Sequence, residues 1–316
     1  MKNVQALRSP DDVIEVKVPG SIANLGPGFD TLAVAVQLYI TVRARRIPGK
    51  GRLEFSFSGY KPCSENCVER AYAYLAGNRF QHLPSWSVEV NSDIPPSAGL
   101  GSSAAATVAG LRLYESVAGG VPMQVLLNAA CALETHPDNA AASLLGGLTL
   151  SCEMKDGSVY ATRFPWPESL AFVVASPATG LATKASRELL PDSVSRADLV
   201  FNLQRVALLL QLLRSGDFSL LKHALDDRVH QPFRENVVPG LSEALRLQHQ
   251  DLLGICLSGS GPSIVAMAER SLWEIGELLA GVYKRQGVKH QLRILEAHQE
   301  AGAPAQMFPA GLLCCS

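Results

Sequence analysis

Apolar and polar residues alternate in three stretches of the first third of the chain, which predicts β-strands there. The stretches are "VIEVKV" (residues 13–18), "LAVAVQLYITVRARR" (32–46) and "WSVEV" (86–90). A glycine-rich turn, "ANLGPGFD", separates the first two stretches. The third stretch leads directly into another glycine-rich segment, "PPSAGLGSSAAA". Two glycine turns are therefore expected at the ends of strands.

A helical pattern begins at Ser102. In "SSAAATVAGLRLYESVAGG", apolar residues recur at every fourth position from Ala105 to Val117, and two glycines end the run. The pattern predicts a second helix over residues 122–134, followed by a turn, "THPDN", and a short apolar segment, "AAASLLGGLTL". The glycine-rich loop therefore opens a helix.

The second half of the chain combines strand and helix patterns. "LAFVVAS" (residues 170–176) is typical of a buried strand, "DLLGICLSGSGPSIVAM" of two strands around a glycine turn, and "QLRILEA" of a closing strand. Helices are predicted for "ADLVFNLQRVALLLQLLR", for residues 217–230 and 239–250, and for "LWEIGELLAGVYKR"; the first has an apolar stripe of Leu199, Leu203, Val206, Leu210 and Leu213. This half is expected to be α+β with antiparallel pairing.

The chain length favours two domains. A chain of 316 residues exceeds the size at which single cores stop growing. Prolines and glutamates interrupt the pattern at residues 160–168, so we expect domains at 1–165 and 166–300 and a poorly ordered tail at 301–316.

Composition narrows the class of protein. Apolar residues make up 47% of the chain, and the net charge of -1 comes without long blocks of either sign. This balance argues against a nucleic-acid partner or a membrane surface and favours a small-molecule partner. No apolar run near the N-terminus resembles a signal peptide, and the seven cysteines are scattered. We expect a cytoplasmic protein with reduced thiols.

The glycine-rich loop has the features of an anion site. Backbone N–H groups at the start of a helix, helped by the helix dipole, favour a phosphate group. The P-loop motif requires a lysine after its second glycine, but Ser102 follows Gly101. The dinucleotide motif requires a third glycine, and alanine stands there, so a dehydrogenase remains an alternative. Taken alone, the two glycines also fit a simple tight turn with a serine cap.

A divalent cation is an obvious substitute for the missing lysine, because phosphoryl transfer requires charge neutralisation. Mg²⁺ usually takes one or two protein oxygens and completes its shell with phosphates and water. Glu134, in "LETHPDN", is the candidate carboxylate, and Ser102 or Ser103 can add a hydroxyl. Taken alone, Glu134 is typical of a solvated acid at a helix end. Taken alone, Asn24 and Asp30 are likewise typical of a turn, and the glycines of "SGSGPS" are typical of a β-hairpin turn.

Three segments together resemble a known family. "PGSIANLGPGFD", "PPSAGLGSSAAA" and "LSGSGPSIVAM" are similar, in order and spacing, to the signature segments of the GHMP small-molecule kinases. Within this superfamily, "ETHPDNAAASLLGG" and "HQPFRENVVPG" resemble segments of the homoserine kinases. The similarity covers residues 13–268.

The resemblance implies an α+β, two-domain GHMP kinase fold. The N-terminal domain would be ribosomal-protein-S5-like with a left-handed β-α-β crossover, the C-terminal domain would be ferredoxin-like, and the site would lie between them. ATP is the implied co-substrate, with its phosphates on the loop formed by Pro95, Pro96, Ser97, Ala98, Gly99, Leu100, Gly101, Ser102 and Ser103. Mg²⁺ would bind Ser102 or Ser103 together with Glu134.

The resemblance also implies an acceptor, L-homoserine, and residues that bind it. Asn24 and Asp30 would lie near its amino and hydroxyl groups, and Asn24, Asp30 and Arg187 form the implied catalytic group. Arg187 and Arg234 would bind the carboxylate, which suits the planar fork of arginine. The other implied contacts are His136, Asp138, Asn139, Thr183 and Gly259. A homodimer is common in this family.

Some positions depart from the family pattern. Gly20, Ser21 and Ile22 differ from the usual small and hydroxyl residues, and Thr135 replaces a common glycine. Neither change removes a charged group, so they bear on fine acceptor specificity and leave the expected reaction intact. The alternatives are a GHMP kinase for another alcohol, such as mevalonate, and a nucleotide-binding relative without catalysis.

Overall fold

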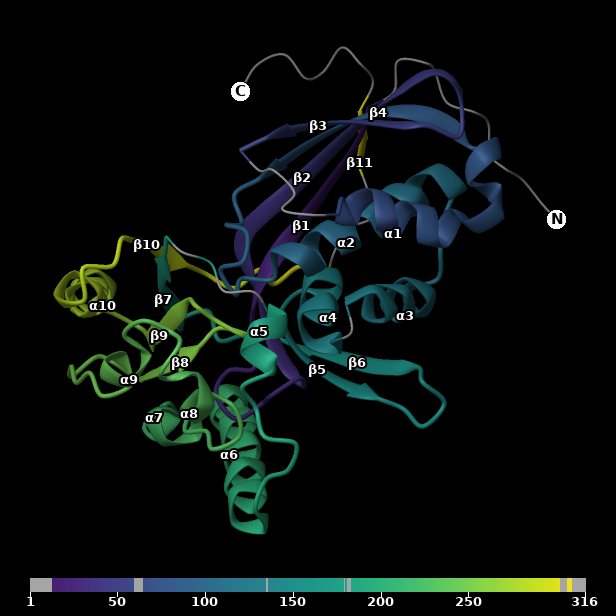
Figure 1. The fold of residues 1–316 in the computed structure, drawn as a ribbon. Helices are drawn as coiled ribbons and strands as arrows, with labels where there is room; N and C mark the ends of the chain where they lie inside the picture. The colour runs from purple at the N-terminus through teal and green to yellow at the C-terminus, as the bar shows by residue number, and fades with distance from the viewer. Residues whose placement is uncertain are drawn as a thin grey trace.

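The alternating stretches form the first of two β-sheets (Figure 1). The computed structural model describes residues 13–59, 65–134, 136–178, 180, 183–301 and 306–308, without the side chains of 183, 184 and 306–308. The first sheet has the order β11-β1-β2-β4-β3, and β2 also pairs with β5, which pairs with β6. Its strands are β1 (Val13–Ala23), β2 (Leu32–Lys50), β3 (Leu53–Ser58), β4 (Pro84–Ser92), β5 (Leu148–Glu153), β6 (Val159–Phe164) and β11 (Gln306–Phe308).

The long strands β1 and β2 pair antiparallel in a register set by their apolar faces. Val18 lies opposite Ile40, and both side chains are buried. The register shifts between Pro19 and Gly20. A Cβ atom at Gly20 would lie 2.8 Å from the carbonyl oxygen of Leu100, so the missing side chain lets the loop after β4 approach β1.

The expected β-α-β unit is present in this sheet. β3 and β4 pair in parallel, and α1 (Cys67–Ala76) and the 3₁₀ helix η1 (Gly77–His82) lie in the connection between them. A crossover of this kind is required because parallel neighbours cannot be joined by a tight turn.

Four helices cover one side of the first sheet (Figure 1). They are α1, α2 (Ser102–Ala118), α3 (Met123–Glu134) and α4 (Pro137–Leu145). Residues 104–114 of α2 are all buried, since this alanine-rich helix packs against β1 as well as α1, α3 and α4. The predicted helices after Ser102 and over 122–134 are confirmed.

The prediction of a turn at "THPDN" was wrong beyond His136, where α4 begins. Pro137 stands at the first position of α4, where proline suits a helix because its N–H group is not needed. Asp138 in the first turn is favourable for the helix dipole. Both residues also occur in turns, so the local sequence fits either structure.

The second sheet is antiparallel, as predicted, with the order β10-β7-β9-β8. Its strands are β7 (Ala171–Pro177), β8 (Gly254–Leu257), β9 (Ile264–Ala268) and β10 (His290–Leu295), and α10 (Leu272–Arg285) packs against it. Two four-residue helices, α7 (Leu221–Ala224) and α9 (Leu241–Ala244), replace the longer helices predicted over 217–230 and 239–250, and a third short helix that was not predicted, α8 (Gln231–Arg234), lies between them. The remaining helix before them is α6 (Arg196–Ser215), preceded by α5 (Thr183–Arg187).

The predicted apolar stripe of α6 was partly wrong. Leu199 and Leu203 are 48% and 60% exposed, whereas the polar Asn202 is buried together with Leu209 and Leu213. Asn202 is buried because it binds the turn before α8, through Asp227 Oδ1 at 2.7 Å. A polar contact therefore decides which face of this helix is turned inward.

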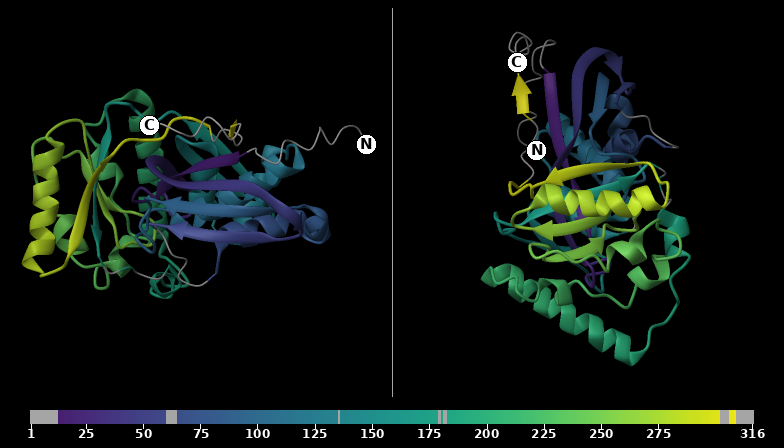
Figure 2. Two further views of the ribbon diagram at one scale, coloured as in Figure 1. Left: turned by 90° about the horizontal axis from the view of Figure 1, so that it is seen from above. Right: turned by 90° about the vertical axis from the view of Figure 1, so that its left-hand side faces the viewer.

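The end of the described chain returns to the first sheet. The backbone N–H of Gln37 donates to the carbonyl of Glu296 at 2.9 Å, and β11 pairs with β1, as Figure 2 shows. The rest of the expected tail lies outside the described residues. The domain limits at 165 and 300 stay predictions.

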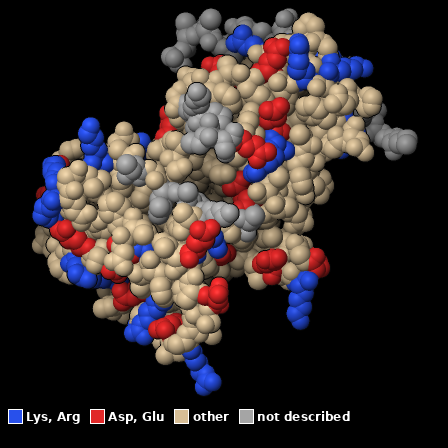
Figure 3. Space-filling view, viewed as in Figure 1, with Lys and Arg blue, Asp and Glu red and all other residues tan. Residues whose placement is uncertain are grey.

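Among the described residues, no helix combines the length and the apolar character needed to cross a membrane. Acidic and basic side chains are interspersed over the face seen in Figure 3, in line with the balanced charge of the sequence. The described cysteines Cys67, Cys131, Cys152 and Cys256 are free thiols.

Candidate active site

A cavity of about 790 Å³ opens between the two sheets and brings together most of the predicted site residues. Residues from the turn after β1, the loop before α2, the ends of α3 and α5, the start of α4, and the loop between β8 and β9 line it. Pro95, Pro96 and Leu100 are not among the lining residues, and Leu100 is buried. The side chain of Thr183 lies outside the described residues.

The loop before α2 depends on glycine at two positions. Gly99 and Gly101 have φ angles of 77° and 71°, in the left-handed region that favours glycine. A Cβ atom at Gly99 would lie 2.5 Å from the carbonyl oxygen of Ser258, and the Ser258 hydroxyl donates to the Gly99 carbonyl at 2.6 Å. The loop therefore packs tightly on the turn between β8 and β9.

The start of α2 lies at the wall of the cavity. Gly101 is the N-cap and supplies no side-chain cap, and the first turn has no acidic residue. Ser102, Ser103 and Ala104 line the cavity. The positive end of a 17-residue helix is thus available to an anion, as the sequence predicted.

Glu134, at the end of α3, is joined to α2 by two hydroxyl groups. The Oγ of Ser103 donates to Glu134 Oε1 at 3.0 Å, and the Oγ1 of Thr107 donates to the same oxygen at 2.6 Å. Arg70 Nη2 lies 3.4 Å from this oxygen. Of the two candidate serines, Ser103 has this contact. Thr107 lies one helical turn after Ser103, so the helical spacing places both residues on the same face of α2. Neither Thr107 nor Arg70 was predicted from the sequence.

These oxygens fit the chemistry of Mg²⁺. A carboxylate with an adjacent hydroxyl supplies the hard oxygen ligands that this ion prefers, and phosphates and water complete its shell. No group of three or more His, Cys, Asp or Glu side chains with metal-binding geometry occurs among the described residues. The site is therefore suited to a metal that arrives with a phosphate ligand, and not to one held by protein ligands alone.

The turn after β1 is held in shape by its own side chains and by the second sheet. Asn24 and Asp30 have φ angles of 71° and 53°, which Asn and Asp tolerate better than most residues. Asn24 Oδ1 accepts the backbone N–H of Asp30 at 3.1 Å, and Asn24 Nδ2 donates to the Gly259 carbonyl at 3.0 Å. The predicted residues Asn24, Asp30 and Gly259 therefore meet.

Two arginines approach this turn from the second half of the chain. Arg187 donates to Asp30 Oδ1, and its guanidinium lies 5.1 Å from the ring centre of Phe29. Arg234 is 1% exposed, and its Nη1 lies 2.8 Å from His230 Nδ1 and 3.4 Å from the Gly259 carbonyl.

Arg234 keeps both its charge and a free donor. Burial, and then the charge of Arg187, lower the pKa of Arg234 to about 10, so it is still protonated at neutral pH. Its buried Nε has no hydrogen-bond partner among the described residues. An unpaired buried donor on a cation is costly, and an anionic ligand would remove that cost.

α4 contributes a buried acid to the same cavity. Asp138 is 2% exposed, and burial, followed by the negative charge of Asp30, raises its pKa to about 6. Asn139 donates its backbone N–H to Asp138 at 2.7 Å, and Ser21 donates its hydroxyl to Asn139 Oδ1 at 2.8 Å. His136, the N-cap of α4, also lines the cavity.

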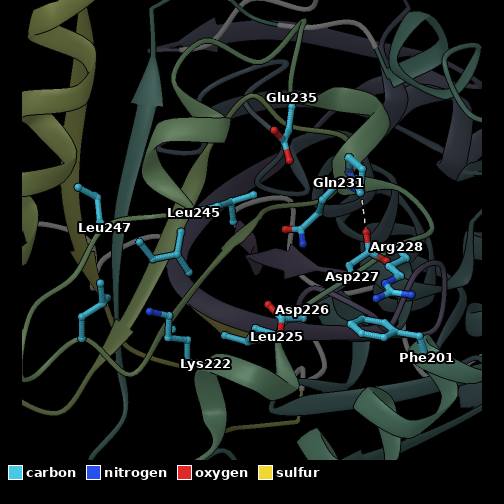
Figure 4. A pocket seen from close by; sticks show the side chains of 14 residues that line it. Phe201, Lys222, Leu225, Asp226, Asp227, Arg228, Gln231, Glu235, Leu245 and Leu247 are labelled. Carbon is cyan, nitrogen blue, oxygen red and sulfur yellow. Dashed lines mark hydrogen bonds between the residues drawn. The ribbon is translucent and has the colours of Figure 1, made fainter. Parts of the chain in front are cut away.

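A second, smaller cavity of about 270 Å³ lies beside α7 and α8 (Figure 4). Leucines form part of its wall, and Lys222, Asp226, Arg228 and Glu235 place charges of both signs around it. None of the predicted site residues lines it. The larger cavity is therefore the candidate active site.

Comparison with known proteins identifies the family. The family model described as "GHMP kinases N terminal domain" matches residues 66–147, and "GHMP kinases C terminal" matches residues 209–272. A homoserine kinase of Solibacter usitatus is 39% identical over 86% of this chain and 90% of its own length. One of Desulfitobacterium hafniense is 36% identical over 92% of this chain and 99% of its own.

A solved structure has the same fold. The crystal structure of homoserine kinase from Cytophaga hutchinsonii has a TM-score of 0.82 and 25% identity, and the match covers 96% of this chain and 100% of that one. The predicted two-domain GHMP kinase fold and the predicted family are confirmed. The chain is an ATP-dependent small-molecule kinase that belongs to the homoserine kinase family of the GHMP kinases.

Proposed function

We propose that this chain transfers the γ-phosphoryl group of ATP to the hydroxyl of L-homoserine, giving O-phospho-L-homoserine for threonine biosynthesis. The observation that carries this proposal is one cavity lined by an anion-binding helix start and by a buried arginine with an unpaired donor. The first suits the phosphates of ATP and the second suits the carboxylate of a small acceptor.

On the nucleotide side, we assign the loop from Ser97 to Ser103 to the phosphates. The first N–H groups of a helix have no partner within it and favour an anion, and the two glycines allow close approach of the backbone. The cavity volume of about 790 Å³ has room for the reacting ends of both substrates.

We assign Ser103 and Glu134 to Mg²⁺. When bound, the ion neutralises negative charge on the phosphates, the task that a lysine performs in P-loop proteins. Thr107 orients the Glu134 carboxylate through its hydrogen bond of 2.6 Å. Arg70 adds a positive charge beside the same carboxylate.

On the acceptor side, Arg234 receives the carboxylate of homoserine, and Arg187 lies close enough to share it. Asn24 and Asp30 face the amino and hydroxyl groups, and His136, Asp138 and Asn139 close the other side of the pocket. A buried arginine has little freedom to move, so it fixes the orientation of the acceptor.

The reaction then requires mainly positioning. The acceptor oxygen forms a bond to the γ-phosphorus as the bond from phosphorus to the β,γ-bridging oxygen breaks, and the hydroxyl proton passes to a carboxylate or to water. Asp30 is the candidate proton acceptor. Its carboxylate is engaged by Arg187, which favours a positioning role over a basic one.

A panel of alcohols tests the proposal. Wild-type protein, γ-labelled ATP and Mg²⁺ are incubated with L-homoserine, mevalonate, galactose and L-serine, and labelled products are separated. We expect transfer to L-homoserine with the highest kcat/KM. Preference for another alcohol would reject the proposed acceptor, and nucleotide binding without transfer to any of them would support a non-catalytic relative.

We also expect a cytoplasmic homodimer, as is common in the family. Light scattering coupled to size-exclusion chromatography measures the mass directly, and a particle of 33.8 kDa would show a monomer.

A further inference from the structure

His230 is a buried histidine that none of the assignments above uses. It is fully buried, lines neither cavity, and lies between Arg234 and the turn that carries Asn24 and Asp30. Each ring nitrogen makes one hydrogen-bonding contact, and Asp227 Oδ2 lies 3.6 Å from Nε2.

The two contacts of the ring define its protonation. Nε2 lies 2.7 Å from the Gly26 carbonyl oxygen, which only accepts, so Nε2 carries the hydrogen. Nδ1 lies 2.8 Å from Arg234 Nη1, which only donates, so Nδ1 carries none. His230 is therefore neutral here, in agreement with the lowering of its pKa by burial. One rigid ring joins the guanidinium to the acceptor turn.

The buried carboxylate of Asp227 fixes the backbone on both sides of His230. Asp227 accepts the backbone N–H groups of Val229, His230 and Gln231 at 2.9, 2.9 and 2.6 Å, and the Nδ2 of Asn202 at 2.7 Å. The contact with Gln231 is drawn in Figure 4. All these donors converge on one side chain, so the backbone that carries His230 into α8 is fixed.

The acceptor turn packs on the other side of the ring. The ring of Phe29 stacks on His230 with centres 5.2 Å apart, and Arg234 lies 5.7 Å from the centre of Phe29. A Cβ atom at Gly26 would lie 2.2 Å from the Leu225 carbonyl oxygen, so the turn also sits directly on the segment after α7. The turn and Arg234 are thus fixed relative to each other by contacts that include no substrate.

We infer that His230 is a positioning residue for acceptor recognition: through Nδ1 it orients the guanidinium of Arg234, and through Nε2 it fixes the turn that carries Asn24 and Asp30. The inference rests on the proposed role of Arg234 in binding the acceptor carboxylate. A loosely held arginine would bind a carboxylate more weakly because its side chain must be ordered on binding.

Two substitutions separate the two contacts. In His230→Gln, the amide nitrogen can replace Nε2 and donate to Gly26, but nothing replaces Nδ1. In His230→Asn, the amide oxygen can replace Nδ1 and accept from Arg234, but the contact with Gly26 is lost. L-Homoserine and 3-aminopropan-1-ol, which lacks the carboxylate, are then compared as acceptors, and thermal unfolding confirms that each variant is folded.

For His230→Gln we expect KM for L-homoserine to rise about tenfold or more, with kcat and KM for ATP within about twofold of wild type. KM for 3-aminopropan-1-ol should not change. His230→Asn should raise KM for L-homoserine less than His230→Gln does, because its amide oxygen can still accept from Arg234. Unchanged KM for L-homoserine in His230→Gln, or an equal rise for both acceptors, would overturn the inference.

Arg234→Met distinguishes the inference from the proposed function. If Arg234→Met keeps the preference for L-homoserine over 3-aminopropan-1-ol, the assignment of Arg234 itself fails. If it loses that preference while His230→Gln behaves as wild type, only the role of His230 fails. Should His230→Gln not fold, ¹⁵N NMR of the wild-type histidines decides: a neutral ring with hydrogen on Nε2 supports the inference, and a charged ring or hydrogen on Nδ1 overturns it.

Discussion

The hydroxyl of Ser103 donates a hydrogen bond of 3.0 Å to a carboxylate oxygen of Glu134. This contact joins the start of α2, which suits phosphate, to the end of α3, which suits a cation. A carboxylate at the C-terminal end of a helix is disfavoured by the helix dipole, so the structure tolerates a local cost at this position. That cost is consistent with a site selected for ligand binding and not for stability.

Ser103→Ala should therefore weaken the use of Mg²⁺ more than Ser102→Ala does. Of these two serines, Ser103 donates its hydroxyl to Glu134, and loss of a group beside a metal site typically costs about tenfold in metal affinity or more. The measurement is the Mg²⁺ concentration needed for half-maximal rate at fixed ATP. Equal effects of the two substitutions would contradict the assignment.

Gly99→Ala should impair nucleotide binding, because the new Cβ would meet the Ser258 carbonyl at 2.5 Å and displace the loop. Gly119→Ala is the matched control: it has a similar φ of 84°, but nothing lies within 4 Å of its Cβ position. Both substitutions should cost about 1–2 kcal/mol of stability from the left-handed backbone. Only Gly99→Ala should raise KM for ATP, and an equal rise in both would show that backbone strain alone is responsible.

The three glycine segments stood out in the sequence because their backbone shape depends on local sequence, and the structure brings residues of all three to one cavity. The sequence could not show which partners would meet them. Arg70 and Thr107 were missed because their importance depends on the position of Glu134, which lies on another helix. The role of His230 was missed for two reasons. Its partner Gly26 is remote in the chain, and its partner Arg234 lies on the short helix α8, which the sequence did not predict.

Secondary structure was predicted best where apolar periodicity and burial agree, as in β1, β2 and α2. It failed where polar contacts decide. On α6, Asn202 is buried because it binds Asp227, while Leu199 is exposed. The spacing of apolar residues cannot predict that a polar residue will be buried in place of a leucine. The helices predicted over 217–230 and 239–250 are only four residues long, α7 and α9, and turns take up the rest of both segments.

Asp30→Asn tests the role of the acid in the acceptor turn. Since Arg187 engages the Asp30 carboxylate, we expect kcat to fall by less than about tenfold, whereas a general base would contribute about 100-fold or more. KM for L-homoserine should rise, because a charged partner for its amino group is lost. A fall in kcat of about 100-fold, measured at saturating substrates, would identify Asp30 as the base.

Asp138→Asn should stabilise the protein at alkaline pH. The pKa of Asp138 is raised to about 6 in the folded state, chiefly by burial, so the folded state binds a proton more tightly than the unfolded state does. Ionisation of Asp138 therefore costs stability, to a limit of about 3 kcal/mol, and this cost grows from about pH 4 to pH 6 and is complete above.

The neutral asparagine removes this cost, so the gain in the thermal unfolding midpoint should be larger at pH 8 than at pH 5. Asp192→Asn, at an exposed position, is the control and should change neither value. If Asp138→Asn lowers the midpoint at pH 8, its charge is stabilised by a partner and the proposed cost is absent. Activity should fall in either case, because Asp138 lines the acceptor pocket.

The central claim is that the start of α2 and a carboxylate-held Mg²⁺ replace the lysine of a P-loop. A crystal structure with Mg²⁺, a non-hydrolysable ATP analogue and L-homoserine tests it most directly. The account predicts the β- and γ-phosphates against Gly99 to Ser103, the ion between those phosphates and Glu134, and the homoserine carboxylate on Arg234. A triphosphate bound elsewhere, with Glu134 turned away from the ion, would contradict it.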